Sequence, residues 1–174
     1  MRVEPARPGD LSELAQVAAT TFPLACPPAV SPDNVAAFIA ANLTAEHFAR
    51  HLDDPQRMVL LARNDVRILG YAMLIGAAPD DASVAAAVPL RPAVELSKMY
   101  VLPDVHGAGV SAALMTEALC RAAELGAACV WLGVNQKNQR AQRFYTKAGF
   151  TVSGTKTFRL GDHTENDYVM VRAV

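Results

Sequence analysis

The sequence predicts an α/β protein with a mixed β-sheet of about seven strands flanked by helices. Stretches with strand-type composition, such as 57–63, 94–101 and 129–134, alternate with stretches whose apolar residues recur at helical spacing. The chain of 174 residues is 52% hydrophobic and 19% charged, which is typical of a globular protein with a real core. No internal repeat is visible. We therefore expect a single domain that spans residues 1–174.

The chain before residue 57 is expected to form one short strand and three helices. Residues 2–7 read as a strand, and Asp10 is placed to cap the helix that follows. After an irregular, proline-rich stretch, Ser31 or Asp33 begins a second helix. Thr44 is the expected cap of a third helix.

A hairpin and a long loop are expected next. Residues 57–63 and 66–77 read as two strands joined by a turn at Asn64 and Asp65. Gly70, inside the second strand, indicates a bend or a bulge. The stretch 79–92 is rich in Ala, Pro and Asp, and we expect a long, mobile loop there.

The centre of the sequence reads as a strand, a glycine-bearing turn and a helix. Residues 94–101 have strand character and end before a proline. Gly107 and Gly109 lie in the turn, and from Val110 to Leu125 the apolar spacing is helical. The N–H groups at such a helix start lack carbonyl partners, and with the helix dipole they form an anion site. The alternative is that the two glycines only make a turn.

The last part of the chain is expected to contribute three strands and one helix. Residues 129–134 read as a buried strand. Asn138 is the expected cap of a helix that Gly149 ends. Strands at 150–160 and 167–171 follow, separated by a polar loop.

Two segments of the chain resemble those of a known family. The run His106-Gly107-Ala108-Gly109-Val110-Ser111 resembles the signature [RQ]-x-x-G-x-[GA] of the GCN5-related N-acetyltransferases, the GNAT family. The run NQRAQRFYTKAGF, at 138–150, is similar to that family's N-x-x-A-x-x-F-Y-x-x-x-G-F. The resemblance implies a GNAT-type, mostly antiparallel sheet and an enzyme that moves acetyl from acetyl-CoA to an amine. The runs ELSKMYVLP, WLGV and FRLGDHTENDYVM resemble the bacterial spermine/spermidine N-acetyltransferases within the family.

The resemblance also implies how acetyl-CoA would be held. Backbone N–H groups of the turn would bind the pyrophosphate, and a bulge in strand 94–101 would aim one N–H at the acetyl oxygen. His106 stands where Arg or Gln is usual and Ser111 where a smaller residue is usual, but neither change removes an N–H. The residues implied to bind the cosubstrate are Met99, Tyr100, Val101, His106, Gly107, Ala108, Gly109, Val110, Ser111, Ala112, Asn138 and Tyr145.

Two residues are candidates for proton transfer. Glu95 lies where some GNAT enzymes carry the general base, and the alternative is a structural carboxylate paired with Lys98 or an arginine. Tyr145 corresponds to the tyrosine that reaches the CoA sulfur in the family, and a Tyr pKa of about 10 suits an acid for a departing thiolate. The alternative for Tyr145 is a core aromatic residue. Asn138 is expected to cap its helix, to touch the cosubstrate, or to do both.

Composition and residue spacing also argue against several other kinds of protein and site. A net charge of −1 argues against a non-specific nucleic-acid binder, and no apolar run of about eighteen residues predicts a membrane span. Cys26, Cys120 and Cys129 read as free thiols of a cytoplasmic protein. No metal site is expected, because His47 and His51 have metal-compatible spacing without a third ligand and read as a solvated helix face. The sequence leaves a homodimer open.

The acceptor is expected to be a small primary amine such as a polyamine. The alternatives are a peptide or protein amine, and a non-catalytic module that only binds acyl-CoA. Family resemblance implies that the first helices and the last hairpin wall the acceptor site. The residues that this would place nearby are Phe22, Phe38, Phe48, Asp162, His163, Glu165 and Asp167. The three acids could attract a cationic amine or simply belong to a solvated loop.

Overall fold

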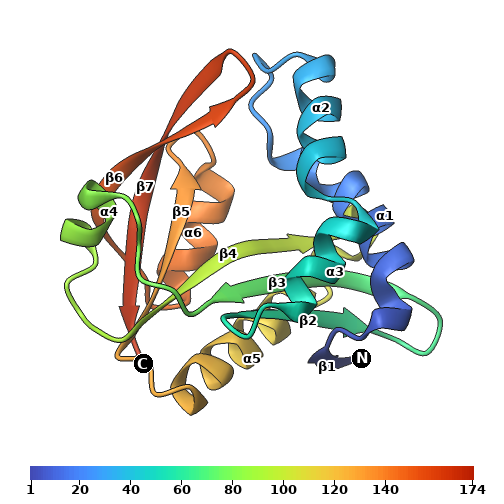
Figure 1. Ribbon diagram of the computed structural model, residues 1–174, viewed down its shortest axis with the longest axis horizontal. Helices are drawn as coiled ribbons and strands as arrows, with labels where there is room; N and C mark the ends of the chain where they lie inside the picture. Colours follow the sequence, from blue (N-terminus) through green and yellow to red (C-terminus); the bar gives the residue numbers. More distant parts are fainter.

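A single seven-stranded sheet forms the centre of the molecule (Figure 1). The computed structural model describes the backbone of residues 1–174 and every side chain except that of His163. The strand order is β1-β2-β3-β4-β5-β7-β6, and the β4–β5 pair is parallel while the other five pairs are antiparallel. The predicted mixed, mostly antiparallel sheet is therefore confirmed. The strands are β1 Arg2–Pro5, β2 Arg57–Arg63, β3 Ile68–Ile75, β4 Ala93–Val101, β5 Cys129–Asn135, β6 Thr151–Leu160 and β7 His163–Ala173.

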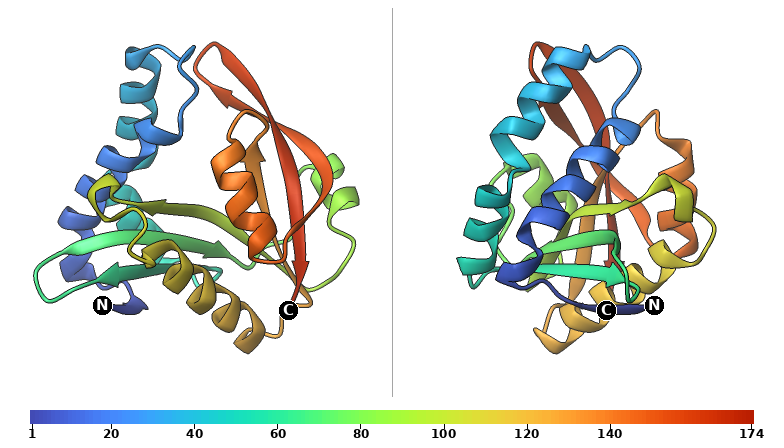
Figure 2. Two further views of the ribbon diagram at one scale, coloured as in Figure 1. Left: turned by 180° about the vertical axis from the view of Figure 1, so that it is seen from behind. Right: turned by 90° about the vertical axis from the view of Figure 1, so that its right-hand side faces the viewer.

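Helices cover both faces of this sheet. One face carries α1, α2, α3 and α4, which lie toward the viewer in Figure 1, and the other carries α5 and α6, which come forward in the left view of Figure 2. Short 3-10 turns connect several of these elements. None of the described helices has the length and hydrophobicity that crossing a bilayer requires. The α-helices are α1 Leu11–Thr21, α2 Pro32–Asn42, α3 Ala45–Asp53, α4 Ala82–Ala87, α5 Val110–Glu124 and α6 Gln139–Lys147.

Local signals placed most helix starts correctly. The side chains of Ser31, Thr44 and Asn138 accept hydrogen bonds from backbone N–H groups three residues later, as expected of N-caps. Asp10 does precede α1, but its carboxylate accepts instead from the N–H of Arg7 and from the guanidinium of Arg63. The N-terminal strand is thereby tied to the start of α1 and to β2.

The stretch 79–92 is not a loop throughout, because α4 forms within it. Asp81 caps this helix by accepting from two backbone N–H groups, and Val84 and Val88 are buried. They pack with Trp131 in an apolar cluster on the α1–α4 face. The prediction of a long loop was wrong here because the stabilising contacts come from distant strands rather than from the helix sequence.

The last hairpin is also tighter and longer than predicted. Strand β7 begins at His163 rather than at residue 167, and only Gly161 and Asp162 separate it from β6. Glu165, expected in the polar loop, and Asp167, expected at the start of the strand, are both buried residues of β7. Residues that alternate along a strand share a face, and Val169 continues the same side of β7 into the core. The acidic residues therefore line the inside of the protein.

Two large apolar cores lie on opposite sides of the sheet. One packs α5 and α6 against it and contains Leu114 and Phe150. The other packs α1, α2 and α3 against it and contains Leu14 and Phe48. The end of β6 joins this second core through Leu160, which is 2% exposed. The hairpin of β6 and β7 thus spans the gap to the N-terminal helices.

Gly70 is a point of close approach between β3 and β4. The pairing of β2 with β3 is irregular beside it, as the predicted bend or bulge requires, because Ala62 pairs with Gly70 and Arg63 with Ile68. A Cβ at position 70 would lie 2.6 Å from the carbonyl oxygen of Tyr100. Moving the backbone of β4 away would disrupt its pairing with β3 and cost free energy. Only glycine therefore allows β4 to lie this close to position 70.

We predict that Gly70→Ala destabilises the protein by about 1–3 kcal/mol, because the methyl group forces β3 and β4 apart. Urea unfolding measures this change in the free energy of unfolding. Gly9→Ala is the matched control, since a Cβ at that position meets no described atom within 4 Å. Equal stability of the two variants would contradict the steric argument.

Candidate active site

The sheet opens between β4 and β5. These strands pair at three positions only, Ala93 with Cys129, Val94 with Val130 and Glu95 with Trp131. Beyond them β4 runs on to Val101 beside β3 alone, and β5 runs on beside β7 alone. The edge of β4 that faces β5 therefore offers backbone donors and acceptors to an extended ligand, as a strand edge does.

A bulge lies at the start of this opening. Met73 pairs with Lys98 and Leu74 pairs with Leu96, so Ser97 is an additional residue in β4. A bulge turns the backbone locally and leaves one residue out of the ladder. The expected bulge in strand 94–101 is thus present, at the point where the two strands separate.

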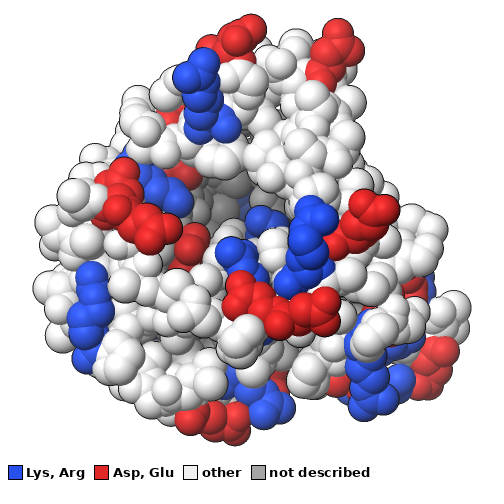
Figure 3. All heavy atoms as spheres, viewed as in Figure 1, with Lys and Arg blue, Asp and Glu red and all other residues white. Residues whose placement is uncertain are grey.

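A cavity of about 520 Å³ follows the opening. Strand residues alternate between the two faces of a sheet, so Leu96 and Met99 face α5 while Glu95, Lys98 and Tyr100 face α1–α3. All five residues line the cavity, which therefore passes through the sheet from one face to the other. Figure 3 shows a hollow on the α1–α4 face with side chains of both charge signs around it.

The glycine turn before α5 has the form of an anion site. Gly107 and Gly109 have φ angles of 86° and 80°, a left-handed conformation that favours glycine. No described atom lies within 4 Å of where their Cβ atoms would be, so the turn is open on its outer side. Helix α5 is fifteen residues long, and its first N–H groups point back toward this turn. The N–H of Ala108 already donates to the carbonyl oxygen of Val105. The N–H groups that can bind an anion are therefore those of the residues after Ala108.

A positive charge reaches the turn from α6. The Nε2 atom of His106 lies 3.1 Å from the carbonyl oxygen of Val101, and a carbonyl can only accept, so Nε2 carries the hydrogen. The guanidinium of Arg140 approaches the other ring nitrogen, Nδ1, at 3.4 Å. Sequence reasoning assigned no role to Arg140, although it lies in the quoted family motif. Its guanidinium brings a fixed positive charge beside His106.

Helix α6 presents Tyr145 to the cavity. The side chain of Asn138 caps the helix by accepting from the N–H of Ala141 at 3.1 Å, and Asn138 also lines the cavity. Burial raises the pKa of the Tyr145 phenol to about 12. At neutral pH the phenol therefore keeps its proton, which a general acid needs, although the higher pKa makes release of that proton harder.

Glu95 and Lys98 form an electrostatically coupled pair on β4. Burial raises the pKa of the Glu95 carboxyl, and the positive charges of Lys156 and Lys98 partly oppose this. Burial lowers the pKa of Lys98, against the effect of Glu95. No ion pair within 4.0 Å joins the two among the described side chains. A carboxyl with a raised pKa suits proton uptake, and the structural alternative for Glu95 stays open.

The residues predicted to bind the cosubstrate divide into two groups. Those that line the cavity are Met99, Tyr100, Val101, His106, Gly107, Ser111, Asn138 and Tyr145. Those absent from its lining are Ala108, Gly109, Val110 and Ala112. Val110 is 2% exposed and belongs to the apolar core, so only its backbone can serve a ligand.

Two acids of β7 enter the far end of the cavity. Glu165 is 4% exposed and accepts hydrogen bonds from Lys137 Nζ at 2.9 Å and Asn135 Nδ2 at 3.2 Å. Asp167 is 9% exposed and makes no hydrogen bond or ion pair with any side chain that the structure describes. Burial raises the pKa of its carboxyl to about 6, although Lys156 opposes the shift. The alternation of Glu165, Asp167 and Val169 was the sequence signal that could have placed them inside.

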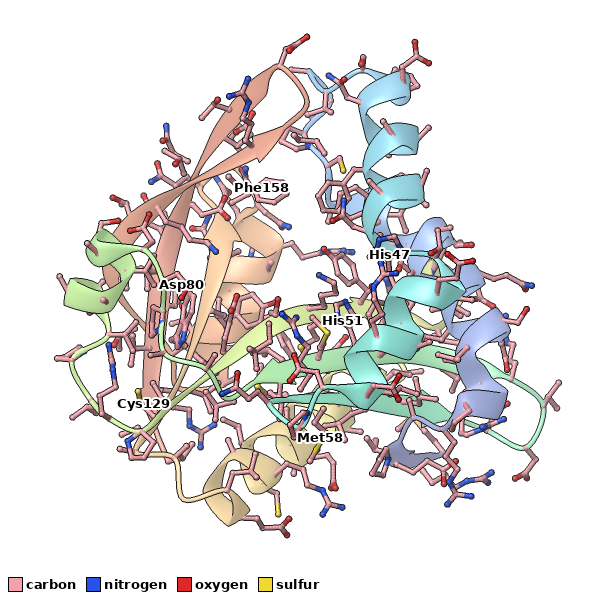
Figure 4. All side chains as sticks on the ribbon, viewed as in Figure 1. His47, His51, Met58, Asp80, Cys129 and Phe158 are labelled. Carbon is pink, nitrogen blue, oxygen red and sulfur yellow. The ribbon has the colours of Figure 1, made fainter. Side chains whose placement is uncertain are left out.

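The other residues proposed near the acceptor are distributed differently. Phe22 and Phe38 line the cavity, whereas Phe48 is fully buried among α1–α3. His47 and His51 on α3 are half-buried rather than on a solvated face, and burial with the charge of Arg57 lowers the pKa of His51 to about 4 (Figure 4). The side chain of His163 lies outside the described residues. No group of three or more metal-ligating side chains occurs in the described part of the chain.

Comparison with known proteins identifies the family. The family model described as "Acetyltransferase (GNAT) family" matches residues 19–150. The chain belongs to the GNAT family of acetyltransferases. It is 60% identical over 163 residues to an uncharacterized N-acetyltransferase of Mycobacterium tuberculosis, covering 94% of this chain and 97% of that one. The same values hold for an uncharacterized N-acetyltransferase of Mycobacterium bovis.

Solved GNAT structures share the fold over the full chain. The PaiA N-acetyltransferase of Thermoplasma acidophilum, solved in complex with coenzyme A, has a TM-score of 0.75 and 20% identity, and all of both chains is covered. A ribosomal-protein-alanine N-acetyltransferase of Brucella melitensis has a TM-score of 0.75 and 18% identity, also over all of both chains. This GNAT protein is an acetyl-CoA-dependent N-acetyltransferase. The split strands, the open turn and the continuous cavity fit an elongated, phosphate-bearing cosubstrate.

We predict that Asp167→Asn stabilises this GNAT enzyme at neutral pH. The folded pKa of about 6 lies above the ordinary value of 3.8, so ionisation of the buried carboxyl costs folding free energy as pH rises through this window. The variant should gain up to about 3 kcal/mol above pH 6, and the gain should vanish below about pH 4. Urea unfolding of both proteins across this pH range measures the difference. Asp162→Asn, at the exposed hairpin turn, should show no such pH-dependent gain.

Proposed function

We propose that this GNAT enzyme acetylates a small primary amine by direct attack in a ternary complex. The observation that carries the proposal is the bridge between the β6–β7 hairpin and α2 at the acceptor end of the cavity. Leu160 is anchored in the core of α1–α3, and Phe158 packs edge-on against Phe38 with ring centroids 5.9 Å apart. A Cβ at Gly161 would collide with Asn34 of α2, so hairpin and helix touch there as well. This bridge restricts the size of an acceptor more than an open groove would.

The proposed roles of the backbone concern binding and orientation. N–H groups at the start of α5 hold the pyrophosphate of acetyl-CoA, and Arg140 adds the positive charge near His106. The open edge of β4 pairs with the pantetheine arm, which directs the thioester to the bulge at Ser97. Acetyl-CoA supplies the activated acyl group. A backbone N–H at the bulge stabilises the negative charge that develops on the carbonyl oxygen, an effect worth about 2.7–4 kcal/mol per donor.

The proposed proton transfers use Glu95 and Tyr145. An alkylamine has a pKa near 10.4 and arrives protonated, so it must lose a proton before it can attack. Glu95 accepts that proton, directly or through water, from the α1–α3 face of the sheet. Tyr145, on the α6 side of the opening, gives its proton to the departing sulfur. The nitrogen loses a second proton when the C–S bond breaks and the amide forms, and this proton replaces the one that Tyr145 gives to the sulfur.

One particular small amine and one other acceptor class have specific support. A polyamine is the small amine that the spermine/spermidine-like runs of the sequence suggest. A peptide amine is suggested by the fold shared with ribosomal-protein-alanine N-acetyltransferases, although the bridge between α2 and the hairpin opposes a bulky acceptor. A module that only binds acyl-CoA would need neither Glu95 nor Tyr145 in its cavity.

Release of free thiol from acetyl-CoA tests the proposed function directly. Small primary amines, spermidine and short peptides are offered separately at equal concentration, and CoA thiol is measured with a chromogenic disulfide. We expect release with small amines and little with peptides. Thiol release with peptides alone would mean that the acceptor is a peptide amine. No thiol release with any acceptor, despite tight CoA binding, would favour a module that only binds acyl-CoA.

We predict that Tyr145→Phe lowers turnover by about 100-fold, because the general acid is lost. The dissociation constant for acetyl-CoA should change little, since the ring is retained. Tyr168→Phe is the control, because Tyr168 packs on the α5 side and does not line the cavity. Undiminished turnover in a folded Tyr145→Phe variant would remove the acid role.

A further inference from the structure

Asp167 is an unusual group for the interior of a protein. It is 9% exposed, lines the cavity, and has no hydrogen-bond or ion-pair partner among the described side chains. Burying a carboxylate without a partner costs free energy, and residues that carry this cost are commonly found where ligands bind. The missing partner of Asp167 is therefore expected to be a cation that arrives with a substrate.

The space beside Asp167 is bounded by Lys156 and Gly133. Lys156 pairs directly with Asp167 across the hairpin. Lys156 Nζ and Asp167 Oδ2 lie 3.0 Å and 3.4 Å from the position that a Cβ of residue 133 would occupy, yet they form no ion pair within 4.0 Å. The ammonium of Lys156 instead lies 5.4 Å from the centroid of the Trp131 ring. The Cε atom of Lys156 lies where a side chain of residue 133 would be, so Gly133 makes room for the Lys156 stem beside the carboxylate.

Aromatic rings form one wall of the cavity that Asp167 also lines. Phe22 and Phe38 stack with centroids 4.5 Å apart and planes 8° apart. Phe38 meets Phe158 edge-on at 5.9 Å, and Phe22 lies 6.4 Å from Tyr100. All four rings line the cavity, and Phe158 shares the inward face of β6 with Lys156. A flat apolar group held against these rings would share the cavity with Asp167.

The charges around the acceptor end leave no surplus of negative charge for several added cations. Glu165 is neutralised by Lys137, and Lys98 and Lys156 face the remaining carboxylates, Glu95 and Asp167. A polyamine would bring two or three further ammonium groups beside these lysines. Ammonium groups that lie close to lysines in a buried site repel them. The cavity lining holds no carboxylate besides Glu95, Glu165 and Asp167 that could balance the added positive charge.

Building on the proposed function, we infer that the acceptor is a monoamine with an aromatic or similarly flat apolar body. Its ammonium group binds to Asp167, and its body packs against Phe22, Phe38 and Phe158. Asp167 orients the nitrogen toward the opening between β4 and β5, where the thioester would lie. The aromatic wall supplies most of the selectivity, because it buries the part of the acceptor that does not react.

Initial rates with 2-phenylethylamine, n-butylamine, spermidine and an alanyl tripeptide test this inference. We expect kcat/KM for 2-phenylethylamine to exceed that for the other three by about ten-fold or more. A clear preference for n-butylamine or spermidine would overturn the inference and leave the small-amine function standing. Acetylation of the tripeptide alone would overturn both.

Two variants separate the ammonium site from the aromatic wall. Asp167→Asn should raise KM for 2-phenylethylamine about ten-fold or more and leave KM for acetyl-CoA unchanged, since only the ion pair is lost. Phe158→Leu should reduce the preference for 2-phenylethylamine over n-butylamine. Asp162→Asn, which alters an exposed acid on the same hairpin, is the matched control. An unchanged amine KM in Asp167→Asn, with CoA binding intact, would show that the ammonium binds elsewhere.

Discussion

The separation of β4 from β5 after three paired residues is the constraint on which the rest of the structure depends. A parallel pair that stops early leaves one edge of β4 without a ladder partner, which a sheet interior otherwise avoids. The bulge at Ser97, on the other edge of β4, lies where the separation begins. Gly70 lets β3 approach the backbone of Tyr100 and hold the diverging strand. The opening, the cavity and the placement of Glu95 all follow from this geometry.

The elements that the sequence predicted well are those governed by local chemistry. Side-chain caps at Ser31, Thr44 and Asn138 began helices as expected, because a cap and its N–H partner lie within one turn. Helix α4 was not predicted, since it is six residues long and depends on packing with Trp131, far away in sequence. Strand β7 was predicted too short because polar residues in an amphipathic pattern look like a loop until the opposite strand is known.

The candidate site divides in the same way. Glycines of the turn could be found from sequence because a left-handed backbone and a helix start have a local signature. The contact of Arg140 with His106 joins two elements that are distant in sequence, so no local pattern reports it. Gly133 of β5 leaves the space that the Lys156 side chain fills beside Asp167, an arrangement of three strands that no local pattern reports. Charge inside a cavity is therefore the part of the site that sequence alone describes least.

The passage of the cavity through the sheet has a consequence for the order of events in catalysis. On the proposed assignment, acetyl-CoA enters from the face of α5 and α6, and the amine enters from the face of α1–α3. Neither substrate then blocks the entrance of the other. CoA can leave by the route that acetyl-CoA took, and the acetylated amine by the route that the amine took. Steric exclusion therefore imposes no compulsory sequence of binding, and an ordered kinetic pattern would have to arise from a change in the protein's conformation.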